Sequence, residues 1–393
     1  MNTATGVLAF DGNVLESGQD NCPNSSTGNA NMPAAYSTQG EVGVCGSWTR
    51  LDDAQYFPEN CPGYQSGEPN AFALGWYPFT FLLADGSTLI AGYSDLTDAR
   101  DPDPYMTRLL DATRTMWQQI EPTATVGQSA VYFQKRSGSE VRSIVMKAGG
   151  NSQSGLVEVA GSDQVYTLDV TNTSNLAWVT KDPLPTNRVD FYLVALPDGK
   201  ILAINGLLFA SGASGAVAVR RPALYDPYIP DAENRWREMN ACSETARPHH
   251  NVAILLPSGA VLSAGGDFPA EAASYEIYKP PYFFQGTRPA ITSIPASAIY
   301  GTWFNVDVSV AASSVTAVRL IRPGAATHSF DQDQRMLELD FTVLDSDTIR
   351  VKAPQNGNAA PPGHYMLFVA TGANGTLPSE GQFIMIRSYL SPP

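Results

Sequence analysis

His249 and His250 are two of only four histidines in the 393-residue chain, and they stand next to each other just before an apolar run at residues 252–256. Neighbouring side chains of a β-strand point to opposite faces, so both imidazoles can reach one metal ion only where the chain is irregular, as at the start of a strand. His328 lies in a similar loop setting far along the sequence. Imidazole is the commonest protein ligand for copper and zinc, so the three histidines predict a mononuclear copper(II) or zinc site with open coordination positions. The competing interpretation makes His249 and His250 polar residues that cap a strand.

The composition favours an all-β, turn-rich globular protein. Charged residues make up only 16% of the chain, while 33 glycines and 29 prolines supply many turns. A formal net charge of -14 argues against nucleic acid or an anionic membrane surface as the main partner, because both repel an acidic surface. No stretch approaches the roughly 18 consecutive apolar residues of a membrane-spanning helix, so no membrane span is expected.

The features that bear on location favour an exported protein. Met1 is not followed by a basic stretch and a hydrophobic run, so no secretory signal is predicted in the given sequence, which is then a mature or truncated form or an intracellular protein. Three sequences fit the N-glycosylation pattern. A disulfide among the first three cysteines is plausible, and its connectivity stays open. The four cysteines are Cys22, Cys45, Cys61 and Cys242.

A repeat of roughly 50 to 70 residues organises the first 286 residues. Each unit has an apolar strand, a turn with glycine, a second apolar strand that ends in glycine, a variable loop and a closing tryptophan. The turns are Asp11-Gly12, Asp85-Gly86, Asp198-Gly199 and Ser258-Gly259, and the closing residues are Trp48, Trp117, Trp178 and Trp236. This pattern predicts a kelch-type β-propeller with about five recognisable blades over residues 1–286. Another kind of sheet stack is the alternative.

The period changes after residue 286. Short alternating strands at residues 303–308, 317–321 and 365–369 have the spacing of a β-sandwich, so residues 287–393 are predicted to form one immunoglobulin-like domain. His328 falls in a loop between two of these strands. The loop must therefore reach the axis of the propeller if His328 is to join His249 and His250.

Several collinear segments carry a family resemblance. They are residues 184–190, 196–206 and 222–227, the link at 274–283 with Arg288-Pro289, the loop at 324–335 and the late strand at 362–368. In this order they resemble the galactose oxidase and glyoxal oxidase family of copper-radical oxidases. The resemblance covers the chain from about residue 70 and is strongest from residue 184.

The resemblance implies a copper site and a redox mechanism. Copper in that family is held by two histidines, an axial tyrosine that precedes one of them, and an equatorial tyrosine joined to a cysteine by a thioether. The crosslinked tyrosine carries one electron of a two-electron alcohol or aldehyde oxidation, and copper carries the other. By position His250 and His328 match the two histidine ligands, and His249 stands where the axial tyrosine belongs.

The chain departs from the family pattern in its first blades. Residues 1–12 align best with the strand that would carry the crosslinked tyrosine, which puts Thr3 at its place, and the first two blades, including the one that would carry the cysteine, have no counterpart. Tyr77, between Trp76 and Pro78, is a candidate redox residue, although its surroundings resemble the fourth blade and a structural role is the alternative. No Tyr–Cys crosslink is therefore expected, and copper alone would carry the chemistry.

Three functional hypotheses follow from the resemblance. The first is a redox-impaired relative with a residual mononuclear copper site and a carbohydrate- or protein-binding role. The second is an active copper-dependent oxidase of primary alcohols or aldehydes that makes hydrogen peroxide, with His249 accepting the proton of the substrate. The third is that the sequence is a piece of a larger propeller. The resemblance also implies an extracellular location.

Overall fold

The computed structural model describes most of the chain from residue 51 onward. The described ranges are 51–54, 65–66, 68–72, 76–95, 105–125, 127–150, 161–208, 217–230, 234–240, 243–267 and 271–388, with the backbone alone of residues 2–3, 6–9, 34–37 and 47–50. The cysteines and the side chain of Thr3 lie outside the described residues.

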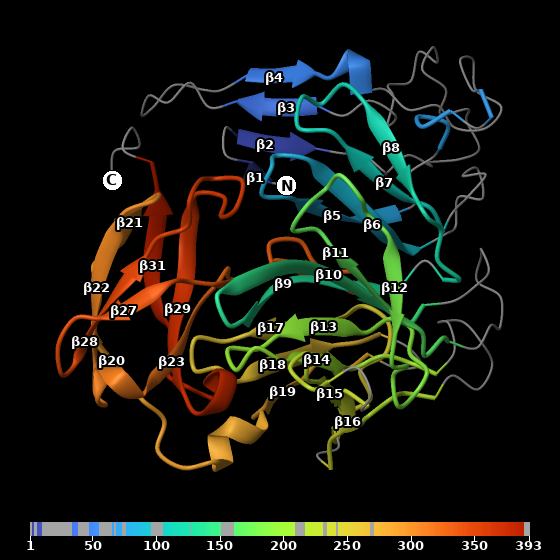
Figure 1. The fold of residues 1–393 in the computed structure, drawn as a ribbon. Helices are drawn as coiled ribbons and strands as arrows, with labels where there is room; N and C mark the ends of the chain where they lie inside the picture. The colour runs from blue at the N-terminus through green and yellow to red at the C-terminus, as the bar shows by residue number, and fades with distance from the viewer. Residues whose placement is uncertain are drawn as a thin grey trace.

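Antiparallel meandering sheets follow one another along the first part of the chain, from the top to the bottom of the view in Figure 1. The first two sheets are β1 (Asn2–Thr3), β2 (Gly6–Ala9), β3 (Ala34–Ser37), β4 (Ser47–Arg50), then β5 (Trp76–Leu82), β6 (Thr88–Asp95), β7 (Thr107–Leu110), β8 (Trp117–Ile120). The third and fourth are β9 (Ser129–Ser137), β10 (Glu140–Ala148), β11 (Val165–Asp169), β12 (Trp178–Lys181), then β13 (Tyr192–Ala195), β14 (Ile201–Ile204), β15 (Ala223–Tyr225), β16 (Trp236–Glu238). The fifth is β17 (Asn251–Leu255), β18 (Val261–Gly265) and β19 (Tyr275–Tyr278).

Two further sheets, at the left of Figure 1, form the sandwich. One contains β26 (Arg335–Glu338), β23 (Val315–Ile321), β29 (Gly363–Thr371), β31 (Gln382–Arg387), β21 (Ser297–Ile299) and, paired with β29, β30 (Leu377–Pro378). The other contains β20 (Ile291–Ser293), β22 (Trp303–Val308), β28 (Thr348–Lys352) and β27 (Phe341–Val343). A separate hairpin joins β24 (Ala326–Thr327) to β25 (Phe330–Asp331). The all-β class and the immunoglobulin-like domain predicted from the sequence are confirmed.

Side-chain hydrogen bonds stabilise the backbone of the predicted turns, as the β5–β6 turn shows. At the β5–β6 turn the carboxylate of Asp85 accepts hydrogen bonds from the backbone N–H and the hydroxyl of Ser87, at 2.9 and 3.0 Å. Gly86 follows Asp85 with a φ of +97°, a conformation that glycine adopts without a steric cost. The Asp-Gly pairs therefore end one strand and begin the next, as the repeat requires.

The sandwich is built into the meandering sheets. β26 pairs in parallel with β9, with Arg335 opposite Tyr132 and Met336 opposite Phe133. The sandwich sheet and the β9–β12 sheet are therefore continuous, a pairing that the sequence analysis did not predict. Two buried clusters also cross the boundary, one joining Phe79 and Leu89 to Val318, the other containing Met336 and Phe191.

A buried ion pair of the sandwich sheet lies at this interface. Arg319 and Glu338, both 1% exposed at their side chains, lie 2.7 Å apart. The guanidinium of Arg319 also donates to the carbonyl of Pro197 at 2.9 Å and to the hydroxyl of Tyr228 at 3.1 Å, in the neighbourhood of the β13–β16 sheet. Its other hydrogen bonds go to the carbonyls of Asn374 and Gly375. A buried charge without such partners would be costly, so these contacts hold the sandwich in one orientation.

None of the helices in the described part of the chain has the length and apolar character of a membrane span.

Lys147 of β10 joins two neighbouring sheets. Its side chain is buried, its Nζ donates to the carbonyl of Ala91 in β6 at 3.0 Å, and it lies 4.8 Å from the ring centroid of Trp178 in β12. Burial lowers the pKa of Lys147 to about 7, because an apolar surrounding disfavours the charged amine.

We expect Lys147 to make the free energy of unfolding depend on pH. The unfolded lysine has a pKa of about 10.4, so between about pH 7 and that value the unfolded state binds the extra proton and stability rises with pH. Between about pH 7 and pH 9 the chain should gain roughly 2 kcal/mol relative to Lys147→Met, as measured by urea unfolding. Lys279→Met, at an exposed lysine, serves as the control and should leave the profile parallel to that of the unaltered chain. A parallel profile for Lys147→Met would contradict the lowered pKa.

Candidate metal centre

The adjacent histidines lie where the chain enters β17, and both face one carboxylate. The Nδ1 of His250 is 2.6 Å from Oδ2 of Asp267, and the Nδ1 of His249 is 3.3 Å from Oδ1. The ring centroids of His249 and His250 are 3.7 Å apart. His250 has a φ of +54°, so the chain is irregular here and both imidazoles reach the same side.

The β17–β18 hairpin explains why Asp267 is present. Its register pairs Asn251 with Gly265, so continuing outward brings His249 opposite Asp267. The backbone N–H of Asp267 donates to the carbonyl of His249 at 3.1 Å, which extends the pairing by two residues along each strand. Arg247, 2% exposed, anchors the preceding segment, because its guanidinium donates to Glu276 at 3.1 Å and to the carbonyl of Gly265 at 3.1 Å.

His328 comes from the sandwich, at the tip of the β24–β25 hairpin. His328 and Ser329 form a two-residue turn, with φ values of +46° and +65°. Type I′ hairpin turns need positive φ at both central residues and normally use Asn-Gly. The side chain of Asp331 steadies the loop, because its Oδ1 accepts the backbone N–H groups of Ala325 at 2.8 Å and Gln334 at 3.1 Å.

The structure brings His249, His250 and His328 together, and Tyr77 with them. The rings of His250 and His328 are 5.2 Å apart between centroids and nearly perpendicular, at 87°. The ring of Tyr77 stacks on that of His328 at 3.5 Å and 8°. Tyr77 also has a positive φ, of +55°, and clustering of such strained residues is characteristic of functional sites.

The electrostatics of the cluster suit a cation. Desolvation opposes ionisation of Asp267, but the hydrogen bonds and charges of His250 and His249 outweigh it and lower the pKa of the carboxyl. Desolvation and the neighbouring His250 and His249 lower the pKa of His328, which favours the neutral form of its imidazole. Neutral imidazole is the form that binds metal ions.

The donor set fits a copper or zinc ion. Among the residues that the structure describes, His249, His250 and Asp267 offer potential ligand atoms within 4.8 Å of one another. His328 lies beside this group, with its ring centroid 5.2 Å from that of His250, and the ring of Tyr77 stacks on His328. Imidazole and phenol donors suit Cu(II), and three imidazoles also suit zinc, so the residues fit the predicted metal.

Sequence reasoning missed the contact of Asp267 with His249 and His250, and it did not place the ring of Tyr77 against that of His328. The hairpin register around Ser258-Gly259 was a usable signal for Asp267, because it places residue 267 across from residue 249. Nothing local in the sequence places Tyr77 beside His328, since the two lie on different domains and no turn connects them.

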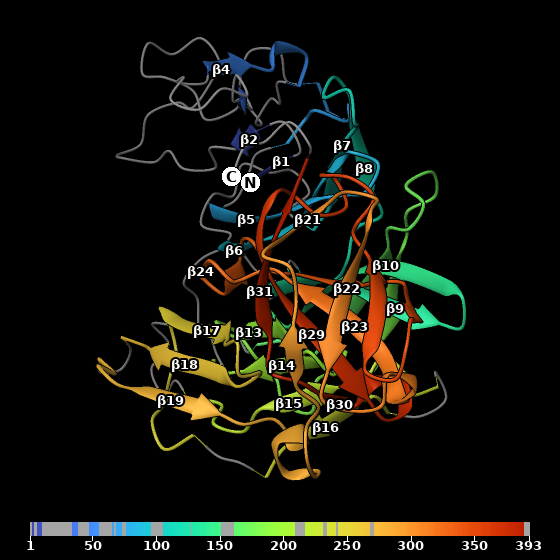
Figure 2. The ribbon, with the colours of Figure 1, turned by 90° about the vertical axis from the view of Figure 1, so that its left-hand side faces the viewer.

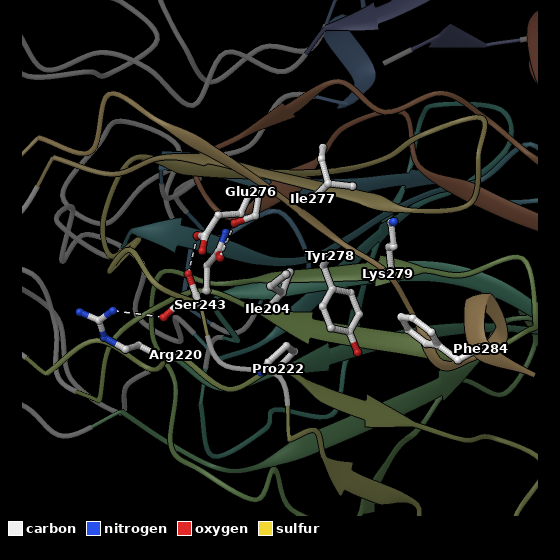
Figure 3. Close-up of a pocket in the computed structure, with 11 residues that line it drawn as sticks. Ile204, Arg220, Pro222, Ser243, Glu276, Ile277, Tyr278, Lys279 and Phe284 are labelled. Atoms are coloured by element: carbon white, nitrogen blue, oxygen red, sulfur yellow. Dashed lines mark hydrogen bonds between the residues drawn. The ribbon is translucent and has the colours of Figure 1, made fainter.

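A cavity of about 290 Å³ beside β14 and β19 is a second candidate site. Figure 3 shows the rings of Tyr278 and Phe284 on one side and, on the other, Ser243 hydrogen-bonded to Glu276. Phe284 is 76% exposed. The lining residues are Ile204, Asn205, Arg220, Pro222, Ser243, Ser263, Glu276, Ile277, Tyr278, Lys279 and Phe284.

Two family models match the chain. The model described as Glyoxal oxidase N-terminus matches residues 68–282, and the model described as Galactose oxidase-like, Early set domain matches residues 288–386.

Individual proteins are similar to the chain as well. Aldehyde oxidase GLOX1 of Arabidopsis thaliana is 33% identical over 55% of this chain and 38% of its own length. Galactose oxidase of Gibberella zeae is 24% identical over 86% of this chain and 48% of its own length. The chain thus spans less than half the length of these curated relatives. A fungal alcohol oxidase of the AA5 family, solved in complex with copper, has a TM-score of 0.70 and 20% identity over 90% of this chain and 70% of that one, which shows the shared fold.

We expect Ser329→Gly to stabilise the chain by about 0.5–1 kcal/mol, because glycine adopts a positive φ without the strain that serine carries there. Chemical unfolding of the two proteins measures the difference. Ser297→Gly, in β21, is the matched control and should instead destabilise by about 0.5–1 kcal/mol, because glycine weakens a regular strand. A loss of stability in both variants would rule out strain at the His328–Ser329 turn.

Proposed function

The chain belongs to the glyoxal oxidase family, and on that premise we propose that it is a copper-dependent oxidase. It would convert a primary alcohol or an aldehyde, with O2, to the oxidised product and hydrogen peroxide. The observation that carries the proposal is the stacking of Tyr77 on His328, 3.5 Å apart, beside the imidazoles of His249 and His250. The sequence-based argument for a redox-impaired relative assumed that the essential phenol was replaced by Thr3. That argument also rested on the missing blade of the crosslinked cysteine, and Tyr77 supports the oxidase proposal because it places an oxidisable phenol beside the imidazoles.

Each residue then has a role. His250 and His328 would hold the copper ion, with His249 as a third donor or as the proton acceptor for the substrate hydroxyl. A bound copper ion supplies an electrophilic site and one-electron redox chemistry. Tyr77 would supply the second one-electron change, so that the pair together removes two electrons from the substrate.

The exposure of the site is consistent with a small external substrate. Tyr77 is 38% exposed, and the side chains of His249 and His250 are 34% and 47% exposed. A substrate hydroxyl can therefore approach these groups from solvent. We also propose an extracellular location, a propeller over residues 1–286 and a sandwich over residues 287–393.

The cavity in Figure 3 favours carbohydrate binding as a second candidate function. The exposed ring of Phe284 and the ring of Tyr278 can cover the apolar face of a sugar, while Glu276 and Ser243 offer polar partners. A redox-impaired relative would retain this property without oxidase activity.

We expect the histidines to control copper binding and Tyr77 to control peroxide formation. His250→Ala and His328→Ala should each lower the copper content of the purified protein at least tenfold. Tyr77→Phe should keep the copper but lower peroxide release from primary alcohols and aldehydes by at least about 10²-fold, because the oxidisable hydroxyl is gone. Tyr275→Phe, on the exposed strand β19, is the control and should behave as the unaltered chain.

Two results would contradict the oxidase proposal. Copper-loaded protein that releases no peroxide from any member of the substrate panel would favour the redox-impaired relative. Full copper content in both the His250→Ala and the His328→Ala variant would rule out a copper site formed by these residues.

The second candidate function has its own test on a glycan array. Binding should weaken at least tenfold in Phe284→Ala, because the exposed ring that covers the sugar is lost. Phe383→Ala, at another exposed phenylalanine, should change nothing. If no glycan on the array binds the protein, carbohydrate binding is ruled out as a function.

A further inference from the structure

We propose that Asp267 is a positioning residue that sets the tautomer of His249 and His250 together and leaves the Nε2 atom of each free to act. The inference rests on the proposed function, because it gives Asp267 a role in the same site. Asp267 would orient the two imidazoles without contacting the metal or the substrate.

The carboxylate serves the two rings with separate oxygens. Oδ2 lies 2.6 Å from Nδ1 of His250, and Oδ1 lies 3.3 Å from Nδ1 of His249. An ionised carboxylate accepts hydrogen bonds and cannot donate them, so each Nδ1 must carry the proton. In a neutral imidazole the other nitrogen, Nε2, then has the free lone pair. The side chain of Asp267 thereby leaves a free lone pair on Nε2 of both His249 and His250.

The distances argue against Asp267 and Nδ1 of His250 as ligands of the same ion. With bonds of about 2.1 Å and angles of about 90° or more, two donors on one ion lie at least about 3 Å apart. The 2.6 Å separation of Asp267 from His250 is a hydrogen-bond distance. The arrangement has the form of a carboxylate–histidine–metal relay, in which the carboxylate fixes the ring and raises its basicity.

The two rings are partly exposed, so a hydrogen bond adds to the packing that orients them. The side chain of His249 is 34% exposed and that of His250 is 47% exposed. A partly exposed ring turns about its last torsion unless a hydrogen bond fixes it. Asp267 is itself fixed by the hydrogen bond, 3.1 Å long, from its backbone N–H to the carbonyl of His249.

The first measurement is the tautomer state in the metal-free full chain, by ¹⁵N NMR of the histidine side chains at a pH where the rings are neutral. We expect His249 and His250 to carry the proton on Nδ1, and Asp267→Asn to shift at least one ring toward the Nε2-protonated form, because an amide has one acceptor oxygen where the carboxylate has two and its NH2 group donates. Asp267→Glu keeps the carboxylate and should restore the Nδ1 proton at His250. Nε2-protonated rings in the unaltered chain would overturn the proposal.

The second measurement is copper affinity by titration of the same proteins. Asp267→Asn should bind copper about 10- to 100-fold more weakly than the unaltered chain. Asp347→Asn, an equal change of charge in the exposed β27–β28 turn, should leave the affinity unchanged. Equal affinity in Asp267→Asn overturns the positioning role while leaving the copper site in place. If the unaltered chain has the expected tautomers but binds no copper, the oxidase proposal fails and the tautomer assignment stands.

Discussion

The site depends on the two-residue turn His328–Ser329, whose backbone has a conformation that residues other than glycine disfavour. His328 and Ser329 both have left-handed φ values, which cost about 1–2 kcal/mol for each residue other than glycine. Such a turn persists only where the surroundings impose it. Asp331 closes the loop through backbone N–H groups, and Gln334 exchanges hydrogen bonds with the backbone of β13, at 2.6 Å from the N–H of Ala195 and 2.9 Å to the carbonyl of Leu193.

The rest of the fold supplies that support. The parallel pairing of β26 with β9 carries the sandwich chain across to the meandering sheets. Figure 2 shows β24 beside β17, the strand that follows His249 and His250. Arg335 adds a cation–π contact with Tyr132 at 4.7 Å and hydrogen bonds to the carbonyls of Leu82 and Asn358. His328 is therefore placed by contacts to three sheets. On the other side, Arg247 and the hairpin register place His249 and His250, so two rigid parts of the molecule meet at the imidazoles.

Much of this was readable from the sequence because it depends on local chemistry. Apolar runs separated by Asp-Gly turns gave the strands, and the change of period gave the sandwich. The family resemblance predicted from residues 184–190 and the loop at 324–335 is confirmed by the family models. Asp267 was recoverable from the hairpin register. The sequence did not predict the contact of Tyr77 with His328 or the β26–β9 pairing. Packing between two distant segments leaves no local pattern in the sequence of either segment.

The central claim is that His250 from one part of the chain and His328 from another bind the same copper ion. Anomalous diffraction at the copper edge, from crystals of the copper-loaded full chain, tests it most directly. The account predicts one ion with nitrogen atoms of both residues at about 2.0–2.1 Å. An ion bound by His249, His250 and Asp267 with His328 outside bonding distance, or no ordered ion near these residues, would contradict it.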